Sequence, residues 1–379
     1  MQWGVYIHIP FCRQKCFYCD FPSYAGKESL MEAYVEALCQ QIEIQGFSYR
    51  QKWGTPATIY IGGGTPTALP QEGMAKVLQA VAEYIGKDID EFTVECNPGT
   101  VDEGYLQLLK KQGVNRLSFG VQSFSDKLLK KIGRIHTGEE ACTVVRMAQK
   151  AGFANISVDL MYGLPGQSLS DLQESVGQAD ELAVRHLSIY GLQLEEGTAF
   201  ARMAEMGKLN LPSEDEAEAM YDYMTHRLPE LGYQRYEVSN FAPKGFESRH
   251  NLSYWHDVPY LGLGAAAHSY LDGKRYAAVT DLAAYIAGIR QNHEIWQMEE
   301  EATREHAMEE FAFLALRTAE GLSGRAFADK FKTSLHAVYG KSMAKMSEQG
   351  LLSVDENGCR LTEKGFKYGN VVFEAFIFD

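Results

Sequence analysis

Residues 5–21 read VYIHIPFCRQKCFYCDF, a β-rich run followed at once by a loop with three cysteines. The run at 5–9 predicts a β-strand, and five similar runs follow it along the chain, at 58–61, 92–95, 116–120, 156–160 and 186–190. Helix-like patterns lie between them, including 30–44, 71–85, 139–150 and 171–182. Six alternations of strand and helix predict an α/β fold, with a parallel sheet curved into a partial (β/α)6 barrel.

Glycine-rich and polar residues follow the ends of these predicted strands. The cysteine loop follows the first strand, the segment GGGTP at 62–66 follows the second, and single polar residues follow the next three: Glu95, Gln122 and Asp159. In barrels of this kind the loops after the strands converge on one mouth. We therefore expect these separate segments to face a single cavity.

The pattern changes after about residue 290, where helix-like segments replace the glycine-rich loops, at 304–317, 324–330 and 334–349. Two short apolar runs, 351–354 and 359–361, flank the turn sequence DENG at 355–358 and predict a hairpin. These elements predict a mainly helical, winged-helix-like domain at 296–379, after a barrel domain at 1–295. Without a basic excess in this segment, we expect a packing or lid role rather than DNA binding.

Charge and hydropathy exclude several classes of partner for the 379-residue chain. Its formal net charge is −14 with no long basic run, which argues against nucleic acid as a partner. Its longest apolar runs, such as 59–61 and 262–267, fall far short of the roughly 20 residues of a membrane span. The first residues show no signal-peptide pattern, so we expect a cytoplasmic protein without an integral membrane segment.

Three of the seven cysteines lie within eight residues, as Cys12-x3-Cys16-x2-Cys19. Three thiolates can hold three irons of a [4Fe-4S] cluster and leave the fourth iron open to an outside ligand such as S-adenosylmethionine (SAM). The alternative is a closed zinc site with His8 as a fourth ligand. The glycine loop lacks the residues of a phosphate-binding loop, and favours a carboxylate, amine or sulfonium whose approach to backbone amides is unhindered by a Cβ. The other cysteines are scattered, and we assign them no function.

Longer motifs around these residues carry a family resemblance. Besides segment 6–12 and the Asp20-Phe21 pair, they are ECNP at 95–98, RLSFGVQS at 116–123 and DLMYGLPG at 159–166. With them the chain resembles the HemN/HemW branch of radical SAM proteins over nearly its whole length. The resemblance implies a [4Fe-4S] cluster on Cys12, Cys16 and Cys19, and SAM bound by Tyr6, Gly63, Gly64, Thr65, Glu95, Gln122, Arg134 and Asp159. A guanidinium can hold the SAM carboxylate in a two-pronged contact, while the carboxylates accept hydrogen bonds from its amine or ribose.

Two features separate the members of this branch. The oxygen-independent coproporphyrinogen III oxidases have the motif C-x3-C-x2-C-x-C, whereas this chain has Phe21 in place of the fourth cysteine. These oxidases also carry an N-terminal extension before their cysteines, whereas this chain has eleven residues before Cys12. The segment RHNLSYW at 249–255 matches the H-N-x-x-Y-W motif of HemW-type haem chaperones, and implies that His250 binds haem iron.

The resemblance therefore implies a chaperone that binds haem and passes it to acceptor haemoproteins, with the cluster and SAM enabling the transfer. The alternative is a coproporphyrinogen oxidase of porphyrin biosynthesis. A SAM-dependent modifier of nucleic acid would need a basic channel that the sequence lacks. The sequence leaves monomer and homodimer both open.

Overall fold

Six parallel strands form the centre of the larger sheet in the computed structural model, which describes residues 2–300 and 302–378. They pair in chain order: β1 (Gly4–Ile9), β2 (Thr58–Gly63), β3 (Glu91–Cys96), β4 (Arg116–Gln122), β5 (Asn155–Tyr162) and β6 (His186–Gly191). The predicted α/β fold and its six parallel strands are confirmed. Each predicted strand lies within an observed strand and is one to three residues shorter than it.

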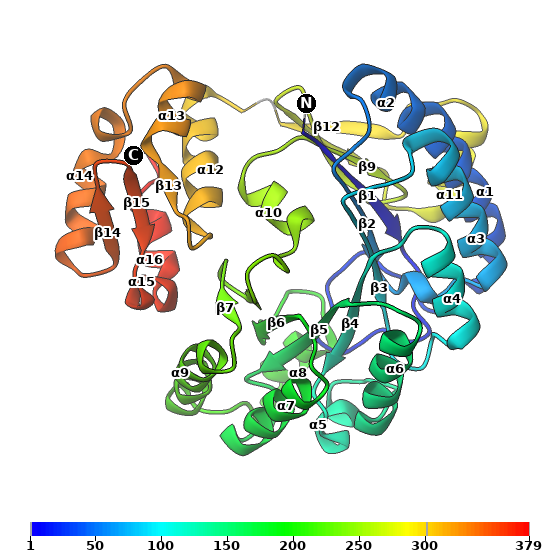
Figure 1. The fold of residues 1–379 in the computed structure, drawn as a ribbon, viewed down its shortest axis with the longest axis horizontal. Helices are drawn as coiled ribbons and strands as arrows, with labels where there is room; N and C mark the ends of the chain where they lie inside the picture. Colours follow the sequence, from blue (N-terminus) through cyan, green and yellow to red (C-terminus); the bar gives the residue numbers. More distant parts are fainter. Residues whose placement is uncertain (1, 301, 379) are drawn as a thin grey trace.

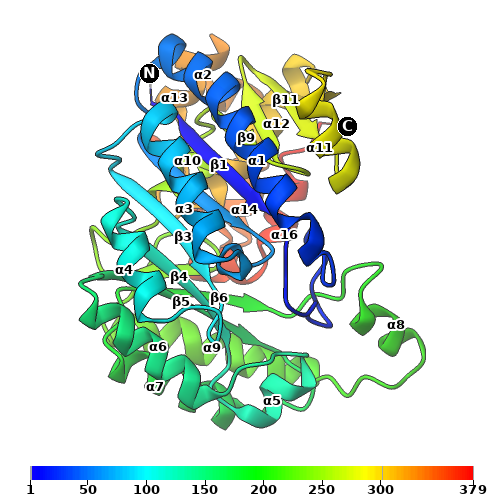
Figure 2. The same cartoon turned by 90° about the vertical axis from the view of Figure 1, so that its right-hand side faces the viewer.

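Helices cover the outer face of this sheet (Figures 1 and 2). They are α1 (Met31–Gln41), α2 (Phe47–Trp53), α3 (Gln71–Ala80), α4 (Glu103–Lys111), α5 (Asp126–Lys131), α6 (Gly138–Lys150) and α7 (Leu169–Glu181). Side chains alternate between the two faces of each strand, and the apolar ones face the helices. In β1, Val5, Ile7 and Ile9 are fully buried under the helices. Tyr6 and His8 point to the other face. The predicted helices 30–44 and 71–85 each continue past their α-helix into a wider π-helical turn, η2 (Ile42–Gly46) and η4 (Val81–Ile85).

The sheet is wider than the sequence predicted, and it stays open. Beside β1 lies β9 (Tyr260–Leu263), followed by the antiparallel strands β10 (His268–Leu271), β11 (Lys274–Ala278) and β12 (Trp296–Glu300). Beside β6 lie β8 (Asn240–Ala242) and β7 (Gln234–Arg235). The predicted division at residue 296 falls at the first residue of β12, so it would assign a strand of this sheet to the C-terminal domain.

A second hydrophobic core belongs to the C-terminal domain. Its elements are α12 (Arg304–Leu316), β13 (Leu322–Ser323), α13 (Gly324–Phe331), α14 (Leu335–Glu348), β14 (Leu352–Asp355), β15 (Gly358–Leu361), α15 (Glu363–Lys367) and α16 (Gly369–Glu374). The three strands form a small sheet in the order β13-β15-β14. Gly358 in the predicted hairpin is required, because its φ is 149° and a Cβ would meet the Leu322 carbonyl oxygen at 2.0 Å. The predicted winged-helix-like arrangement is confirmed.

The two domains meet along β7 and α9 (Glu214–Glu230). The Arg235 guanidinium lies over the rings of Tyr221, Phe241 and Phe366, at 5.5, 5.2 and 4.8 Å. Lys367 forms ion pairs with Glu218 and Asp222 of α9. Because Phe366 and Lys367 belong to α15, these contacts fix the end of the C-terminal domain against the barrel. Between the two domains lies α10 (Arg249–Trp255), near the middle of Figure 1.

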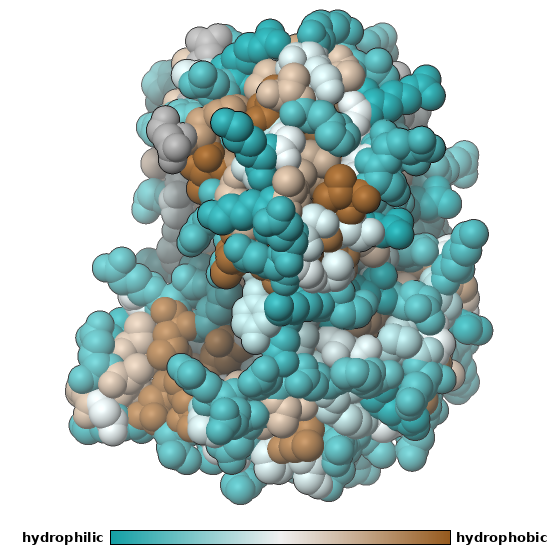
Figure 3. All heavy atoms as spheres, turned by 90° about the vertical axis from the view of Figure 1, so that its left-hand side faces the viewer, coloured by the Kyte–Doolittle hydropathy of each residue, from teal (hydrophilic) through white to brown (hydrophobic). Residues whose placement is uncertain are grey.

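Four elements remain, of which three are η1 (Glu28–Leu30), η3 (Pro66–Ala68) and α11 (Leu282–Arg290). The helix α8 (Ala199–Glu205) projects from the barrel (Figure 2). Apolar side chains gather on the surface around α8, at the lower left of Figure 3. Exposed members of the α8 segment include Leu194, Met206 and Leu211. None of the helices in the described residues combines the length and the apolar character that crossing a bilayer requires.

Candidate cluster and ligand site

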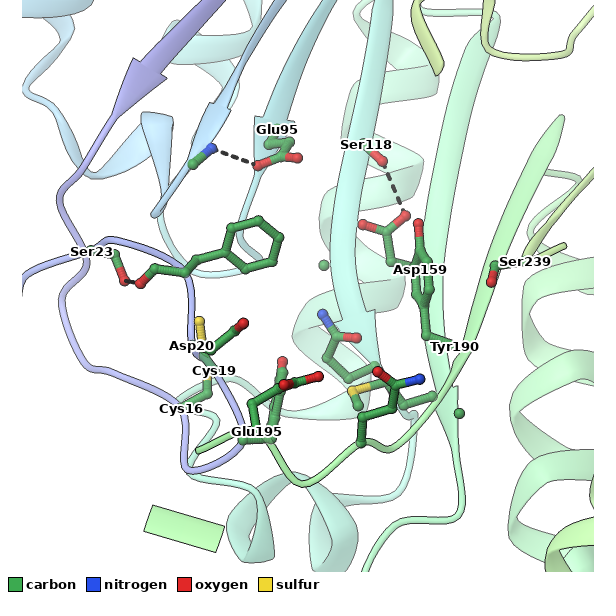
Figure 4. A pocket seen from close by; sticks show the side chains of 18 of the residues that line it. Cys16, Cys19, Asp20, Ser23, Glu95, Ser118, Asp159, Tyr190, Glu195 and Ser239 are labelled. Carbon is green, nitrogen blue, oxygen red and sulfur yellow. Dashed lines mark hydrogen bonds between the residues drawn. The ribbon is translucent and has the colours of Figure 1, made fainter. Parts of the chain in front are cut away.

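A cavity of about 830 Å³ lies where the strand ends of the barrel meet the C-terminal domain. Its size is in the range of small-molecule and cofactor sites. The barrel contributes the cysteine loop on one side and the ends of β4, β5 and β6 on the other, as Figure 4 shows. The C-terminal domain closes part of it with Arg317 and residues 366–371 and 373. The predicted convergence of the strand ends on one cavity is therefore confirmed.

The cysteine loop is fastened at both ends while its thiols face the cavity. The Cys12 amide donates to the Tyr24 carbonyl at 3.0 Å, and the Phe17 amide donates to the Ile132 carbonyl at 3.1 Å. Cys12, Cys16 and Cys19 all line the cavity as free thiols, and burial raises the pKa of Cys19. Two of the three loop sulfurs already have a polar neighbour, since Thr65 Oγ1 lies 3.6 Å from Cys12 Sγ and Arg134 Nη1 donates to Cys16 Sγ at 3.5 Å.

This thiol set fits a cluster better than a zinc ion. Among the described residues, no three His, Cys, Asp or Glu side chains converge closely enough to hold one metal ion. His8 is also engaged, because its Nδ1 lies 2.8 Å from the Tyr6 hydroxyl and its Nε2 lies 2.8 Å from the Pro22 carbonyl oxygen. A four-iron cube keeps its thiolates apart, one on each of three irons. Three separated thiols around one cavity match that requirement.

The backbone amides of the glycine loop donate hydrogen bonds to protein acceptors. The amides of Gly63, Gly64 and Thr65 donate to the Glu95 carboxylate and to the carbonyls of Ile9 and Phe11, at 3.2, 3.0 and 2.8 Å. A Cβ at Gly63 would lie 2.5 Å from the His8 ring, and one at Gly64 would lie 2.8 Å from the Phe11 oxygen. The Gly63 amide therefore ties the loop to β3, while those of Gly64 and Thr65 tie it to the segment that leads into the cysteine loop. Contact of the glycine loop with a ligand stays a prediction.

Two half-buried carboxyl groups face the cavity above the cysteines (Figure 4). Glu95 accepts from the Tyr60 hydroxyl at 2.7 Å, and burial raises its pKa to about 7. Asp159 accepts from the hydroxyls of Ser118 and Ser157 at 3.1 and 3.4 Å, and burial raises its pKa as well. Both groups retain oxygen atoms suited to an amine or ribose hydroxyl of a ligand.

Gln122 and Arg134 complete the predicted group at the cavity. Gln122 sits at a β-bulge between β4 and β5 with a φ of 69°, a strained conformation that re-aims the strand end toward the cavity. Arg134 donates to Asn97 Oδ1 at 2.9 Å and to the Gly120 carbonyl, so protein acceptors fix the orientation of its guanidinium.

Tyr6 and His250 are the two predicted residues that do not line this cavity. Tyr6 is held behind it by His8 and stacks on Tyr60 with ring centres 6.3 Å apart. His250 lies at the opposite end of the barrel, against Thr58 at the first position of β2.

Both ring nitrogens of His250 have hydrogen-bond partners in this structure. Nδ1 lies 2.8 Å from Thr58 Oγ1, and Nε2 lies 2.7 Å from the Tyr254 hydroxyl. Burial lowers the pKa of His250 to about 3. Glu91 fixes the helix that carries it, accepting from the amides of Arg249 and His250 at 2.8 and 2.9 Å. Because His250 is also buried, iron ligation by it requires α10 to move and the Tyr254 hydroxyl, on the same helix, to turn away.

The C-terminal residues of the cavity wall were missed by sequence reasoning. Arg317, Tyr368 and Asn370 face the same space as the cysteines although they lie about 300 to 360 residues away along the chain. No local pattern marks them, since only the docking of one domain on the other brings them there.

Comparison with known proteins places this geometry among relatives. The family model described as the radical SAM superfamily matches residues 6–179, and the HemN C-terminal domain model matches residues 302–367. The heme chaperone HemW of Bacillus subtilis (strain 168) is 40% identical over 378 residues, 99% of each chain. That of Escherichia coli (strain K12) is 34% identical over 381 residues, 99% of this chain and 98% of its own.

A solved structure of similar fold is coproporphyrinogen III oxidase (HemN) from Escherichia coli, a radical SAM enzyme. It superposes with a TM-score of 0.84 at 22% identity, over 99% of this chain and 90% of that one.

Proposed function

Because this chain belongs to the HemW family of the radical SAM superfamily, we propose that it is a cytoplasmic haem chaperone that passes haem to acceptor haemoproteins. The observation that carries the proposal is the shared cavity, in which three free cysteines face a wall contributed by the C-terminal domain. That arrangement offers space for a second ligand beside a cluster-bound SAM.

The chain's own residues divide into holding and orienting roles. Cys12, Cys16 and Cys19 would hold the [4Fe-4S] cluster, which when bound supplies one-electron reduction of SAM. The carboxyl groups of Glu95 and Asp159 would orient the amine or ribose of SAM, and Arg134 its carboxylate.

The glycine loop would still lie beside SAM, as the resemblance implies, but would contact it with groups other than its amides. The carbonyls of Gly63 and Gly64 and the Thr65 hydroxyl are the atoms that would contact it. Tyr6 lies behind the cavity wall and would contribute to the SAM site indirectly, through its hydrogen bond with His8.

Haem ligation by His250 is part of this proposal as a second state of the protein. It needs α10 to move away from β2, because His250 is buried and its Nδ1 is occupied by Thr58, and it needs the Tyr254 hydroxyl on the same helix to turn away from Nε2. The closed state would then keep the ligand hidden until haem or an acceptor is present.

The proposal is tested with the full-length protein, reconstituted with iron and sulfide without oxygen. It should bind haem with a defined Soret band and transfer it to an apo-haemoprotein. With SAM and a reductant it should release no carbon dioxide from coproporphyrinogen III, since Phe21 replaces the fourth cysteine of the oxidases. Turnover of coproporphyrinogen at about one per second or faster, an ordinary enzyme rate, without haem transfer, would make the oxidase the correct function.

A further inference from the structure

Arg317 brings a positive charge from the C-terminal domain into the cavity. It directly follows the last residue of α12, and the next residues fasten the chain to the barrel. Thr318 forms a β-bridge with Glu237, and the Ala319 amide donates to the Tyr236 carbonyl at 2.9 Å. Arg317 lines the cavity near Tyr190. Figure 4 shows Tyr190 on the side of the cavity opposite Cys16 and Cys19.

Aromatic rings hold the guanidinium of Arg317. The ring of Trp255 lies 4.5 Å from it and the ring of Phe313 lies 5.5 Å from it. A planar guanidinium stacked in this way keeps its N–H groups directed along its own plane. The position is thus defined without any hydrogen bond.

Arg317 has no direct ion-pair partner within residues 2–300 and 302–378, and Glu237 acts on its charge only from a distance. The side chain of Arg317 makes no ion pair or hydrogen bond there, and its buried Nε has no partner. A buried Nε without a partner also occurs in Arg134, but Arg134 and Arg275 differ in having acceptors for their terminal nitrogens, since Arg134 donates to Asn97 and Arg275 pairs with Glu310. The nearby acid Glu237 uses its carboxylate to accept from the Ser239 amide at 2.9 Å and from the Asn240 side chain.

An unpaired, largely desolvated cation is unfavourable in a folded protein. Such a group is stabilised when a ligand brings the missing anion, and a guanidinium matches a carboxylate best. The SAM carboxylate is assigned to Arg134 on the cysteine side, so the ligand for Arg317 is a different one. Haem carries two propionate carboxylates on one edge of its ring.

We propose that Arg317 binds a propionate carboxylate of the tetrapyrrole from the wall that the C-terminal domain contributes. The inference rests on the proposed haem function. Trp255 acts as a positioning residue, because its ring supports the guanidinium. Glu91, Thr58 and Tyr254 fix α10 under Arg317 in the closed state. When α10 opens for His250, the contacts of Thr318 with Glu237 and of Ala319 with Tyr236 still hold Arg317 at the cavity wall.

The test compares haem with haem dimethyl ester, in which both carboxylates are masked. Titrations use the clustered, full-length protein, and the variants are Arg317→Met, Arg317→Lys and the control Arg325→Met. Arg325 is the matched control because it lies in the same domain with its side chain 92% exposed. The parent protein and the control should bind haem about tenfold more tightly than the ester.

Arg317→Met should reduce this preference to less than about threefold by weakening haem alone, with Arg317→Lys intermediate because a point charge lacks the fork. Without haem, Arg317→Met should melt at the same temperature as the parent or higher, since it removes a partly buried cation that has no ion-pair partner. A lower melting temperature together with equal weakening of haem and ester would assign Arg317 a structural role and overturn the inference. A preference for haem retained in Arg317→Met, or absent in the parent, would overturn it while leaving the haem function intact. Failure of the parent to bind either compound would refute the proposed function itself.

Discussion

Replacing Glu91 by Gln should release α10 from the end of the barrel. The buried carboxylate accepts from the amides of Arg249 and His250 and from the Ser248 hydroxyl, at 2.8, 2.9 and 3.3 Å. A glutamine retains one acceptor oxygen and turns an NH₂ group toward the remaining donors. A hydrogen bond to a charged group contributes about 1.5–3 kcal/mol, and an unsatisfied buried donor costs about 1–3 kcal/mol.

Because burying the carboxylate itself has a cost, we expect the local stability of α10 to fall by about 2–4 kcal/mol. Each 1.4 kcal/mol corresponds to a factor of ten, so the amides of α10 should exchange with deuterium about 30 to 1000 times faster. Hydrogen exchange read on peptides covering 249–256 measures this directly. The amides of β4 should be unaffected, since the opening is local.

The control is Glu247→Gln, which changes a carboxylate just before α10 that accepts one exposed amide, from Gly245 at 2.7 Å. It should leave the exchange of α10 unchanged. Equal exchange of α10 in the parent protein and in Glu91→Gln would refute the view that Glu91 holds this helix. If His250 ligates haem after α10 opens, Glu91→Gln should also bind haem faster than the parent.

Three further outcomes are expected. Cys16→Ala should abolish the [4Fe-4S] absorption after anaerobic reconstitution, and one tight, stoichiometric zinc in the parent with no cluster would show the thiols to be a zinc site. Arg134→Lys should weaken SAM binding measured by calorimetry on the clustered protein without loss of the cluster, because an ammonium lacks the guanidinium fork; unchanged affinity would remove Arg134 from the SAM site. The folded-state pKa of Glu95 is raised to about 7, so its protonated form favours the fold and its contribution declines as the pH rises from about 4.5 through 7. In urea titrations, the unfolding free energy of Glu95→Gln minus that of the parent should therefore rise by about 1–3 kcal/mol between pH 5 and pH 8. If this difference stays constant across the range, Glu95 is ionised throughout.

The six central strands and the cysteine loop could be predicted because their signals are local. A run such as Val5–Ile9 alternates between the helix-covered face and the barrel interior, and this alternation is visible in the sequence itself. The mouth of the cavity followed from a general rule of parallel sheets, which places the ends of consecutive strands together. Cys12, Cys16, Cys19, Glu95 and Asp159 were therefore found from their positions after strands.

The outer strands of the sheet gave no comparable signal. β7 has two residues and β8 has three, and such short segments gain their hydrogen bonds only from a neighbouring strand. The edge strand β12 also gave no local signal, so the predicted domain division at residue 296 assigned it to the C-terminal domain. Its pairing with β11 is a long-range contact that no local pattern announces.

The sequence by itself determined the α/β architecture, the three-thiol loop and the acids at the strand ends, because each depends on periodicity or spacing within a few residues. Only the tertiary structure decided what the segment 249–255 does: His250 turns into the barrel end while Trp255 supports Arg317 at the cavity. The same holds for the glycine loop, whose amides are taken by Glu95, Ile9 and Phe11. Which partner a hydrogen-bonding group or a charge meets is set by packing between distant segments, and that information appears only when the whole chain is folded.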